Sequence, residues 1–125
     1  DSDGLKMSVS STLAEANFVI FGNNNDNSGT TSSDIVGITK RSKREWHFDE
    51  SGTVTADVKI DISDATGHTG STSAASNYKL LYASCNGCTF VELDTGDSTS
   101  GDVVTFSNVA IKDGIYAIAS ADSNL

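Results

Sequence analysis

The feature that most constrains this chain is an alternation of apolar and polar side chains with a period of two. It is clearest between residues 54 and 62, where every second residue is apolar: Val54, Ala56, Val58, Ile60 and Ile62. The intervening residues are Thr, Asp and Lys, which suit a hydrated surface. Because successive side chains of a strand point to opposite faces, this pattern predicts a half-buried antiparallel strand.

The same pattern recurs in short segments along the whole chain, each bounded by Gly, Asn, Asp or Ser. The further segments are 5–9, 18–21, 46–48, 78–83, 89–93, 103–106, 109–111 and 115–121. Eight or nine strands at this spacing predict an all-β fold, an antiparallel two-sheet β-sandwich with jelly-roll or Greek-key connections. No segment has helical periodicity, so we expect no substantial helix. The length fits a single module over residues 1–125.

Composition and charge narrow the possible functions. Acidic residues number 17 and basic residues 8, which gives a net charge of −9 and argues against a nucleic-acid partner. No apolar run approaches the roughly 20 residues that span a bilayer, so we expect no membrane span. There is no zinc, phosphate-loop or dinucleotide motif. Only His47 and His68 could serve a catalytic triad, so we do not expect an enzyme.

The two cysteines occur as Cys85-Asn86-Gly87-Cys88. Asn-Gly is a strong signal for a two-residue hairpin, so the cysteines are expected to flank a tight turn. There is no second cysteine pair and no nearby His to complete a zinc site. A short-range disulfide therefore fits best, together with an extracellular location; the alternative is two reduced thiols in an exposed loop.

One segment carries a recognisable pattern. Arg44, Trp46, Glu50 and Gly52 form an Arg-x-Trp-x-x-x-Glu-x-Gly stretch, which leads into the Val-rich strand ending at Ser63. This stretch resembles one in a β-sandwich module of large bacterial surface and secreted proteins. The resemblance implies an extracellular location and a structural or adhesive role, and no known enzymatic activity.

The resemblance extends over nearly the whole chain. Segment 77–81, Asn-Tyr-Lys-Leu-Leu, is similar to the family's Asp-Tyr-x-Leu-Leu, segment 101–116 is similar to its Thr-Phe…Asp-Gly-x-Tyr ending, and segment 17–25 is similar to its early strand. In one place the chain departs from the family pattern. Where the family often carries an Asp-rich loop that could hold calcium, residues 84–90 read Ser-Cys-Asn-Gly-Cys-Thr-Phe. A calcium site at that loop is therefore not expected.

Calcium elsewhere stays open, because the chain has many oxygen ligands in its loops. The candidates lie in the polar 22–34 loop and around the Gly96 and Gly101 turns: Asp26, Asp34, Asp94, Asp97 and Asp102. A further pair, Asp61 and Asp64, flanks a strand end. The alternative is that these aspartates only begin turns, which Asp does well.

A basic cluster stands out on this acidic chain. It consists of Lys40, Arg41, Lys43 and Arg44, half of all basic residues. It could bind an acidic partner, including an acidic face of another copy. The alternative is local pairing, in which Arg44 binds a cross-strand carboxylate. The aromatic residues Trp46 and Phe48 lie in phase on one strand face, so we expect them in the core.

The N-terminal strand offers a route to assembly. Leu5, Met7 and Val9 form a short amphipathic strand that could pair within its own domain or enter a neighbour's sandwich. We expect a secreted structural subunit of an extracellular bacterial filament, sheath or surface layer, which self-associates through strand edges, N-terminal strand exchange and charge complementarity. The alternative is an adhesin-type module that binds a glycan or surface ligand through the 22–34 and 63–77 loops.

Overall fold

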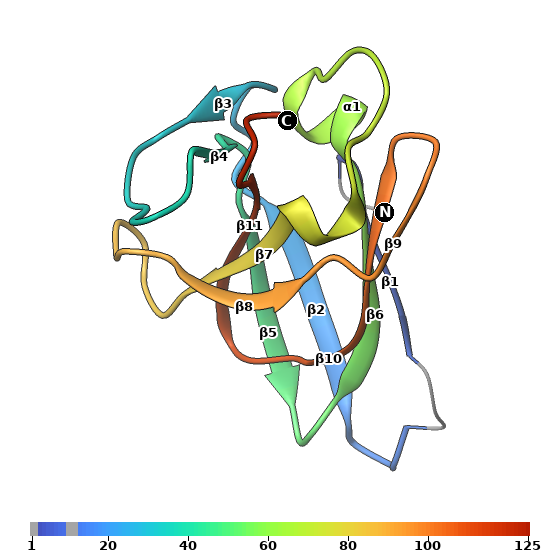
Figure 1. Cartoon of the computed structure of the whole chain (residues 1–125). Helices are drawn as coiled ribbons and strands as arrows, with labels where there is room; N and C mark the ends of the chain where they lie inside the picture. The colour runs from blue at the N-terminus through green and yellow to red at the C-terminus, as the bar shows by residue number, and fades with distance from the viewer. Residues whose placement is uncertain (1–2, 10–12) are drawn as a thin grey trace.

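The computed structural model describes residues 3–9 and 13–125 and consists of two antiparallel sheets packed face to face (Figure 1). The four-stranded sheet has the order β1-β6-β10-β9. In the seven-stranded sheet, β11 is central: β7 and then β8 lie on one side, and β5 with β2, and β4 with β3, lie on the other. The fold is therefore an antiparallel β-sandwich, as the alternation predicts.

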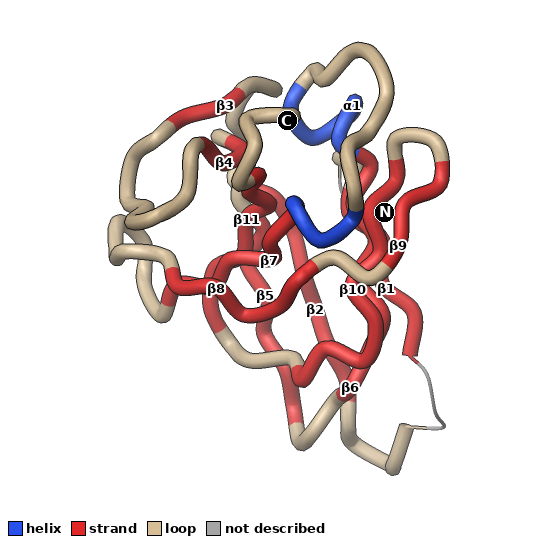
Figure 2. Tube along the Cα trace, in the orientation of Figure 1, coloured by secondary structure: helices blue, strands red, loops and turns tan. Residues whose placement is uncertain are grey.

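The elements are short and joined mostly by tight connections. In the described part of the chain, helix is limited to two short segments (blue in Figure 2). The bounds are β1 Leu5–Val9, β2 Phe18–Asn23, β3 Thr30–Thr31, β4 Lys40–Ser42, β5 Trp46–Ser51, β6 Thr55–Asp61, α1 Ile62–Thr66, the 3₁₀ turn η1 Ala75–Asn77, β7 Tyr78–Ala83, β8 Val91–Thr95, β9 Ser98–Ser100, β10 Val103–Ala110 and β11 Gly114–Ser120. Neither helix has the length and apolarity needed to cross a membrane, within the described ranges.

The main core lies between the two sheets. Trp46 and Phe48 are fully buried there, which confirms their expected place on the inner face of β5. The ring of Phe48 stacks on Tyr116 of β11 with centroids 4.2 Å apart. Burial raises the pKa of Tyr116 to about 12. Its hydroxyl nevertheless donates to the Lys112 carbonyl, so this buried polar group is satisfied.

A second hydrophobic cluster covers part of the outer face of the seven-stranded sheet. Every residue of β11 is buried, on both faces of the strand. The outward residues Ile115, Ala117 and Ala119 pack with Leu81, Ala83 and Phe90, and Ile35, Ile38 and Cys88 lie against them. The 32–39 loop and the segment that holds the cysteines therefore form a lid over this outer cluster.

The expected strands are present, with differences at their ends. Segments 103–106 and 109–111 belong to one strand, β10, which is interrupted by a bulge after Phe106 with Asn108 at φ +54°. The local pattern of apolar and polar residues contains no signal for β3, β4, β9 or α1. The five-residue helix α1 begins because the Asp61 carboxylate caps the N–H groups of Ser63 and Asp64. It ends at Gly67, whose φ of +77° suits glycine.

Candidate functional site

The two sheets end side by side at β1 and β2, and we call this flank the open side. β1 is the last strand of the four-stranded sheet and β2 is the last strand of the seven-stranded sheet. Among the residues that the structure describes, no strand pairs with the outer edge of either. At one end, the Asn23 side-chain amide donates to the Asp3 carboxylate over 2.5 Å and joins the two edges.

An apolar groove of about 500 Å³ runs between these edges. Its lining is Met7, Ser8, Val9, Leu13, Val19, Phe21 and Val54. Met7, Val19 and Phe21 are half-buried and pack against the main core. The groove is therefore a part of the core that reaches the surface, rather than a separate pocket.

Apolar side chains also gather outside the groove. Phe18 is 47% exposed and Ile20 is 63% exposed, both on the outer face of β2. Of the six large hydrophobic residues that are exposed in the described ranges, four belong to this flank: Val9, Leu13, Phe18 and Ile20. Strand β2 contains no charged residue. Natural sheet edges normally carry charge, Pro or bulges that prevent pairing, and contiguous exposed apolar patches mark interaction sites.

The structure places the three predicted residues of β1 differently from one another. β1 pairs antiparallel with β6 of its own chain, which is the ordinary edge-strand arrangement. Leu5 is fully buried in the main core, so it is not available to a partner. Met7 lines the groove, and Val9 is exposed at its rim. Sequence reasoning missed Phe18 and Ile20, because it assigned segment 18–21 as a short apolar run without knowing that it forms an edge.

The basic cluster does not form one surface patch. Arg41 is only 4% exposed in the single chain, and its contact with a partner stays a prediction. Its guanidinium donates to the carbonyls of Ser33 and Ser42, lies 3.1 Å from the Glu45 carboxylate and stacks over the Phe90 ring. Arg41 thus fixes the lid over the outer cluster from within.

The guanidinium of Arg44 is also hydrogen-bonded within the chain. It donates to the carbonyls of Asp3, Asp26 and Asp64, and so ties together three segments far apart in the sequence. This replaces the cross-strand carboxylate pair that was the local alternative. Lys43 is exposed and Lys40 is half-buried. Of the four basic residues in the cluster, these two lysines are therefore the ones with side chains accessible to a partner.

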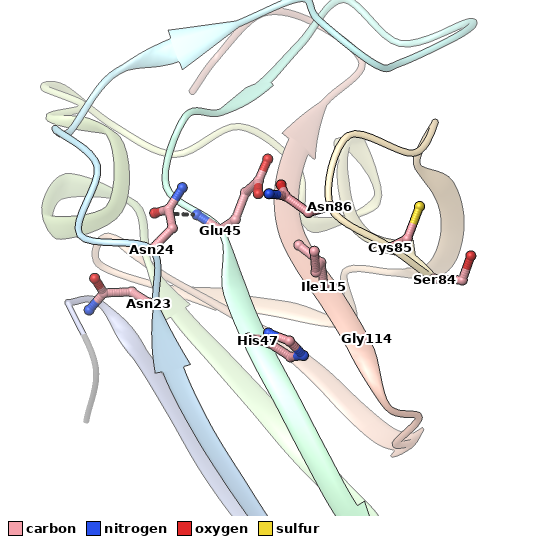
Figure 3. Close-up of a pocket in the computed structure, with 9 residues that line it drawn as sticks. All are labelled: Asn23, Asn24, Glu45, His47, Ser84, Cys85, Asn86, Gly114 and Ile115. Carbon is pink, nitrogen blue, oxygen red and sulfur yellow. Dashed lines mark hydrogen bonds between the residues drawn. The ribbon is translucent and has the colours of Figure 1, made fainter.

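A polar hollow of about 430 Å³ lies on the outer face of the seven-stranded sheet (Figure 3). It is lined by Asn23, Asn24, Glu45, His47, Ser84, Cys85, Asn86, Gly114 and Ile115. A second hollow of about 430 Å³ shares Asn24, Glu45 and Asn86 and continues to Asp26, Thr31, Ser33, Arg41 and Lys43. We call the two together the polar groove. The 22–34 loop contributes to it and the 63–77 loop does not.

The cysteine prediction is confirmed: Cys85 and Cys88 form a disulfide with Cα atoms 5.3 Å apart. The Cys88 N–H donates to the Cys85 carbonyl over 3.2 Å, which closes the turn around Asn86 and Gly87. This loop forms one wall of the polar groove. Its chain then continues to Phe90, whose N–H donates to the Asp34 carbonyl.

The aspartates proposed for calcium are spread over the molecule. Within residues 3–9 and 13–125, no three acidic, His or Cys side chains converge as a metal site would require. Asp26 accepts from the Asn27 N–H, Asp34 lies 3.7 Å from Arg41, and Asp97 accepts from the Ser107 N–H. Asp94 and Asp97 are near enough to repel each other. The Asp102 carbonyl accepts a hydrogen bond from the Ile62 N–H. Calcium binding stays a prediction.

The opposite flank of the sandwich, formed by β8 and β9, is the closed side. Here the chain passes directly from one sheet to the other through Gly96 and Asp97. The Gly96 N–H donates to the Tyr78 carbonyl and the Asp97 N–H donates to the Thr105 carbonyl, each over 2.9 Å. Glu92 and Asp94 lie on β8, and Lys79 of β7 bridges to Glu92 at 3.3 Å.

Comparison with known protein families finds one whose model matches most of this chain. The family described as Domain of unknown function (DUF8202) matches residues 4–115. The chain belongs to this family. The match begins one residue before β1 and reaches into β11, so DUF8202 includes both edges of the open side. No curated protein and no solved structure gives a significant match.

Proposed function

We propose that this chain is a secreted structural subunit of an extracellular bacterial assembly, and that its copies associate through the open side. The observation that carries the proposal is the combination of two unpaired strand edges with an apolar groove between them. Such edges are templates for pairing with another chain. The second copy is the occupant that we propose for this flank.

Backbone chemistry supports association by strand edges. The chain contains no proline, so no residue of β1 or β2 lacks an N–H group for a new ladder. Strand addition supplies affinity through main-chain hydrogen bonds and specificity through alternate side chains. Both kinds of contact are available along β2, where exposed apolar side chains alternate with residues that line the groove.

The structure favours edge pairing over exchange of the N-terminal strand. Exchange would require Leu5 to leave a fully buried position and the Gly4 carbonyl to release the Asp61 N–H, which it accepts over 2.7 Å. Edge pairing breaks neither contact. Charge complementarity through the exposed Lys43 could add to the association, while Arg41 and Arg44 act within the chain.

An extracellular location is supported by the disulfide, because such bonds persist in oxidising compartments. It also agrees with the resemblance to surface and secreted modules. Filament, sheath and surface layer are the forms of assembly that we propose for such a subunit.

The proposal is tested by measuring mass in solution over a wide concentration range. Light scattering after size exclusion should show a mass that rises with concentration, and negative-stain microscopy should show oligomers. Because apolar contacts drive the association and the net charge of −9 opposes it, added salt should strengthen it. A strict monomer at millimolar concentration and high salt would overturn the proposal.

A second candidate function is recognition of a glycan or other surface ligand through the polar groove. The observation that favours it is the set of amide, carboxylate and imidazole groups that converge there from β2, β5 and the disulfide loop (Figure 3). A glycan array tests it directly. Binding should disappear in His47→Ala and persist in the matched control Asp57→Ala on the other sheet; equal binding by both variants would overturn it.

A further inference from the structure

We propose that the first contact between copies is a two-fold antiparallel pairing of β2 with β2 of a second copy, with Ile20 on the symmetry axis. This inference rests on the self-association proposed above and specifies which edge and which register it uses. An isologous contact of this kind uses the same patch on both copies, as in most homodimers. It would join two seven-stranded sheets into one continuous sheet.

The hydrogen-bonding direction of β2 supports this pairing. In an antiparallel pair, alternate residues point their N–H and C=O groups toward the partner strand. The Asn24 N–H donates to the Glu45 carbonyl at the end of the β2–β5 ladder, and the register from Phe18 to Asn23 has no shift. The even-numbered residues of β2, including Ile20, therefore direct their backbone N–H and C=O groups toward β5. Val19 and Phe21 direct their backbone groups outward, where a second copy can bind them.

The side-chain pattern then selects the register. With Ile20 opposite Ile20, Val19 of each copy pairs with Phe21 of the other. The outward N–H and C=O groups of these two residues then form hydrogen bonds with each other. Phe18 of each copy lies opposite Gly22 of the other. Because Ile20, Phe18 and Gly22 fall at non-hydrogen-bonded positions of the new ladder, their Cα atoms approach to about 4.5 Å. The aromatic ring thus covers a residue that has no side chain of its own.

Gly22 provides an observation independent of the apolar surface. A Cβ at this position would meet nothing within 4 Å, and the φ of Gly22 is not in the left-handed region. Neither space nor conformation within the chain requires glycine there, although glycine in a strand interior is less stable than alanine. Glycine in a strand often marks close approach of another group, and an aromatic residue placed over an edge glycine is a recognised stabilising device.

The available surface is adequate for a weak or moderate dimer. The exposed parts of Val9, Leu13, Phe18 and Ile20 amount to on the order of 300 Å² of apolar area per copy, against about 800 Å² per partner in a standard interface. Backbone edges and the groove rim supply further area. The six residues of β2 carry no charge, so two acidic chains meet along a neutral strip.

Charge pairs on the axis test the register. Ile20→Lys places two lysines face to face in the dimer, and Ile20→Glu places two glutamates there, so each variant alone should dissociate at least about tenfold more readily than the wild type. An equimolar mixture should restore association as a heterodimer, because Lys then faces Glu. Ile20 is 63% exposed in the single chain, so both variants should keep the wild-type melting temperature.

Two controls separate this register from any other use of the edge. Phe18→Lys mixed with Phe18→Glu should not restore association, because the two Phe18 positions lie about 13 Å apart along the strands in this register. The pair Val36→Lys and Val36→Glu, in an 81% exposed loop, should associate like the wild type. Rescue by the Phe18 mixture, or no rescue by the Ile20 mixture, would overturn the inference.

Cross-linking gives a second readout. Ile20→Cys should form an interchain disulfide under mild oxidation, because non-hydrogen-bonded partners lie within the Cα range of about 4.4–6.8 Å that disulfides need. Val36→Cys is the matched control and should remain monomeric on a non-reducing gel. If the wild type associates but Ile20→Cys does not cross-link, this pairing is wrong and the proposed self-association stands. If the wild type never associates, both proposals fail.

Discussion

The two flanks of the sandwich differ in how far their edge strands are protected from pairing with another chain. On the closed side, the chain itself crosses between the sheets at Gly96 and Asp97, and the edge strand β9 has only three residues. On the open side, β1 and β2 run for five and six residues, with an apolar groove between them. The three-residue β9 and the carboxylates of β8 protect one flank from pairing, while β2 on the other flank has six residues and no charge.

This difference indicates where an interaction surface is to be sought in this sandwich. Both flanks have the same core, so stability alone does not explain why one is polar and crossed by the chain. An exposed apolar edge carries a risk of aggregation, and a chain that retains one is expected to use it.

The largest effect is expected where the open side is anchored. Leu5→Ala should lower the free energy of unfolding by about 3 kcal/mol, because it leaves a cavity under β1. Val9→Ala, at the exposed end of the same strand, should change stability by about 0.5 kcal/mol or less. Urea unfolding of both variants checks this, and equal effects would show that β1 is not held by its own core.

Two alanine substitutions of glycine, one on each flank, allow the flanks to be compared directly. Gly96→Ala should destabilise the protein by about 2 kcal/mol, because a Cβ there would meet the Ala75 carbonyl oxygen, which is backbone and cannot turn away. Gly22→Ala should leave the single chain unchanged or stabilise it by about 0.5 kcal/mol, since it meets open space. Thermal melting at low concentration measures both. A costly Gly22→Ala would mean that the glycine is required within the chain.

Exposed apolar residues on the two flanks should differ in association rather than stability. Ile20→Ser should weaken self-association several-fold, because it removes an aliphatic pair from the proposed axis. Val91→Ser on β8 is the matched control, with 58% exposure in the wild type, and should associate normally. Sedimentation equilibrium compares the two. If Val91→Ser has the larger effect, the closed side is the interface.

The smallest effect concerns the acidic residues that protect the closed side. Burial raises the pKa of Asp94, and repulsion from Asp97 and Glu92 adds to the shift. Folding therefore favours protonated Asp94, and stability falls as pH rises through the folded pKa. Asp94→Asn should be more stable than the wild type at pH 7, by about 0.5 kcal/mol or less, and equal to it below pH 3.

Asp122 is the control of opposite sign for that experiment. A hydrogen bond from the Ser120 hydroxyl lowers its pKa. This contribution to stability is present above the unfolded pKa and is lost as pH falls through the folded pKa. Asp122→Asn should therefore be less stable than the wild type at pH 7, with the difference shrinking in acid. Chemical unfolding at pH 7 and pH 3 gives both comparisons, and parallel pH profiles would contradict the assigned causes.

The sequence predicted most of the fold because alternation reports burial residue by residue. Val58 and Ile60 are buried where their pattern requires, and Cys85 and Cys88 are joined. It could not predict which strand lies at an edge, since that depends on the order of strands, which local pattern does not contain. The pattern therefore places Ile20 in a strand but does not place it at an exposed edge.

Local chemistry explains the other differences. Two- and three-residue strands such as Thr30–Thr31 are too short to show alternation. The burial of Arg41 could not be read from charge, because it depends on two carbonyls and an aromatic ring that the 32–39 loop, strand β4 and the segment before β8 bring together. The 22–34 loop predicts part of the polar groove, but the local pattern of β5 does not indicate that Glu45 and His47 line it.

The lid over the outer cluster has a consequence for how the molecule opens. The main core is enclosed by two sheets, whereas the outer cluster is covered only by the 32–39 loop, the disulfide turn and the guanidinium of Arg41. The molecule therefore has two tiers of local stability: amides beneath the lid should exchange with deuterium through a partial opening, and those of β6 and β10 only through global unfolding. A protease that cuts the lid would expose one face of β11 while the sandwich remained folded.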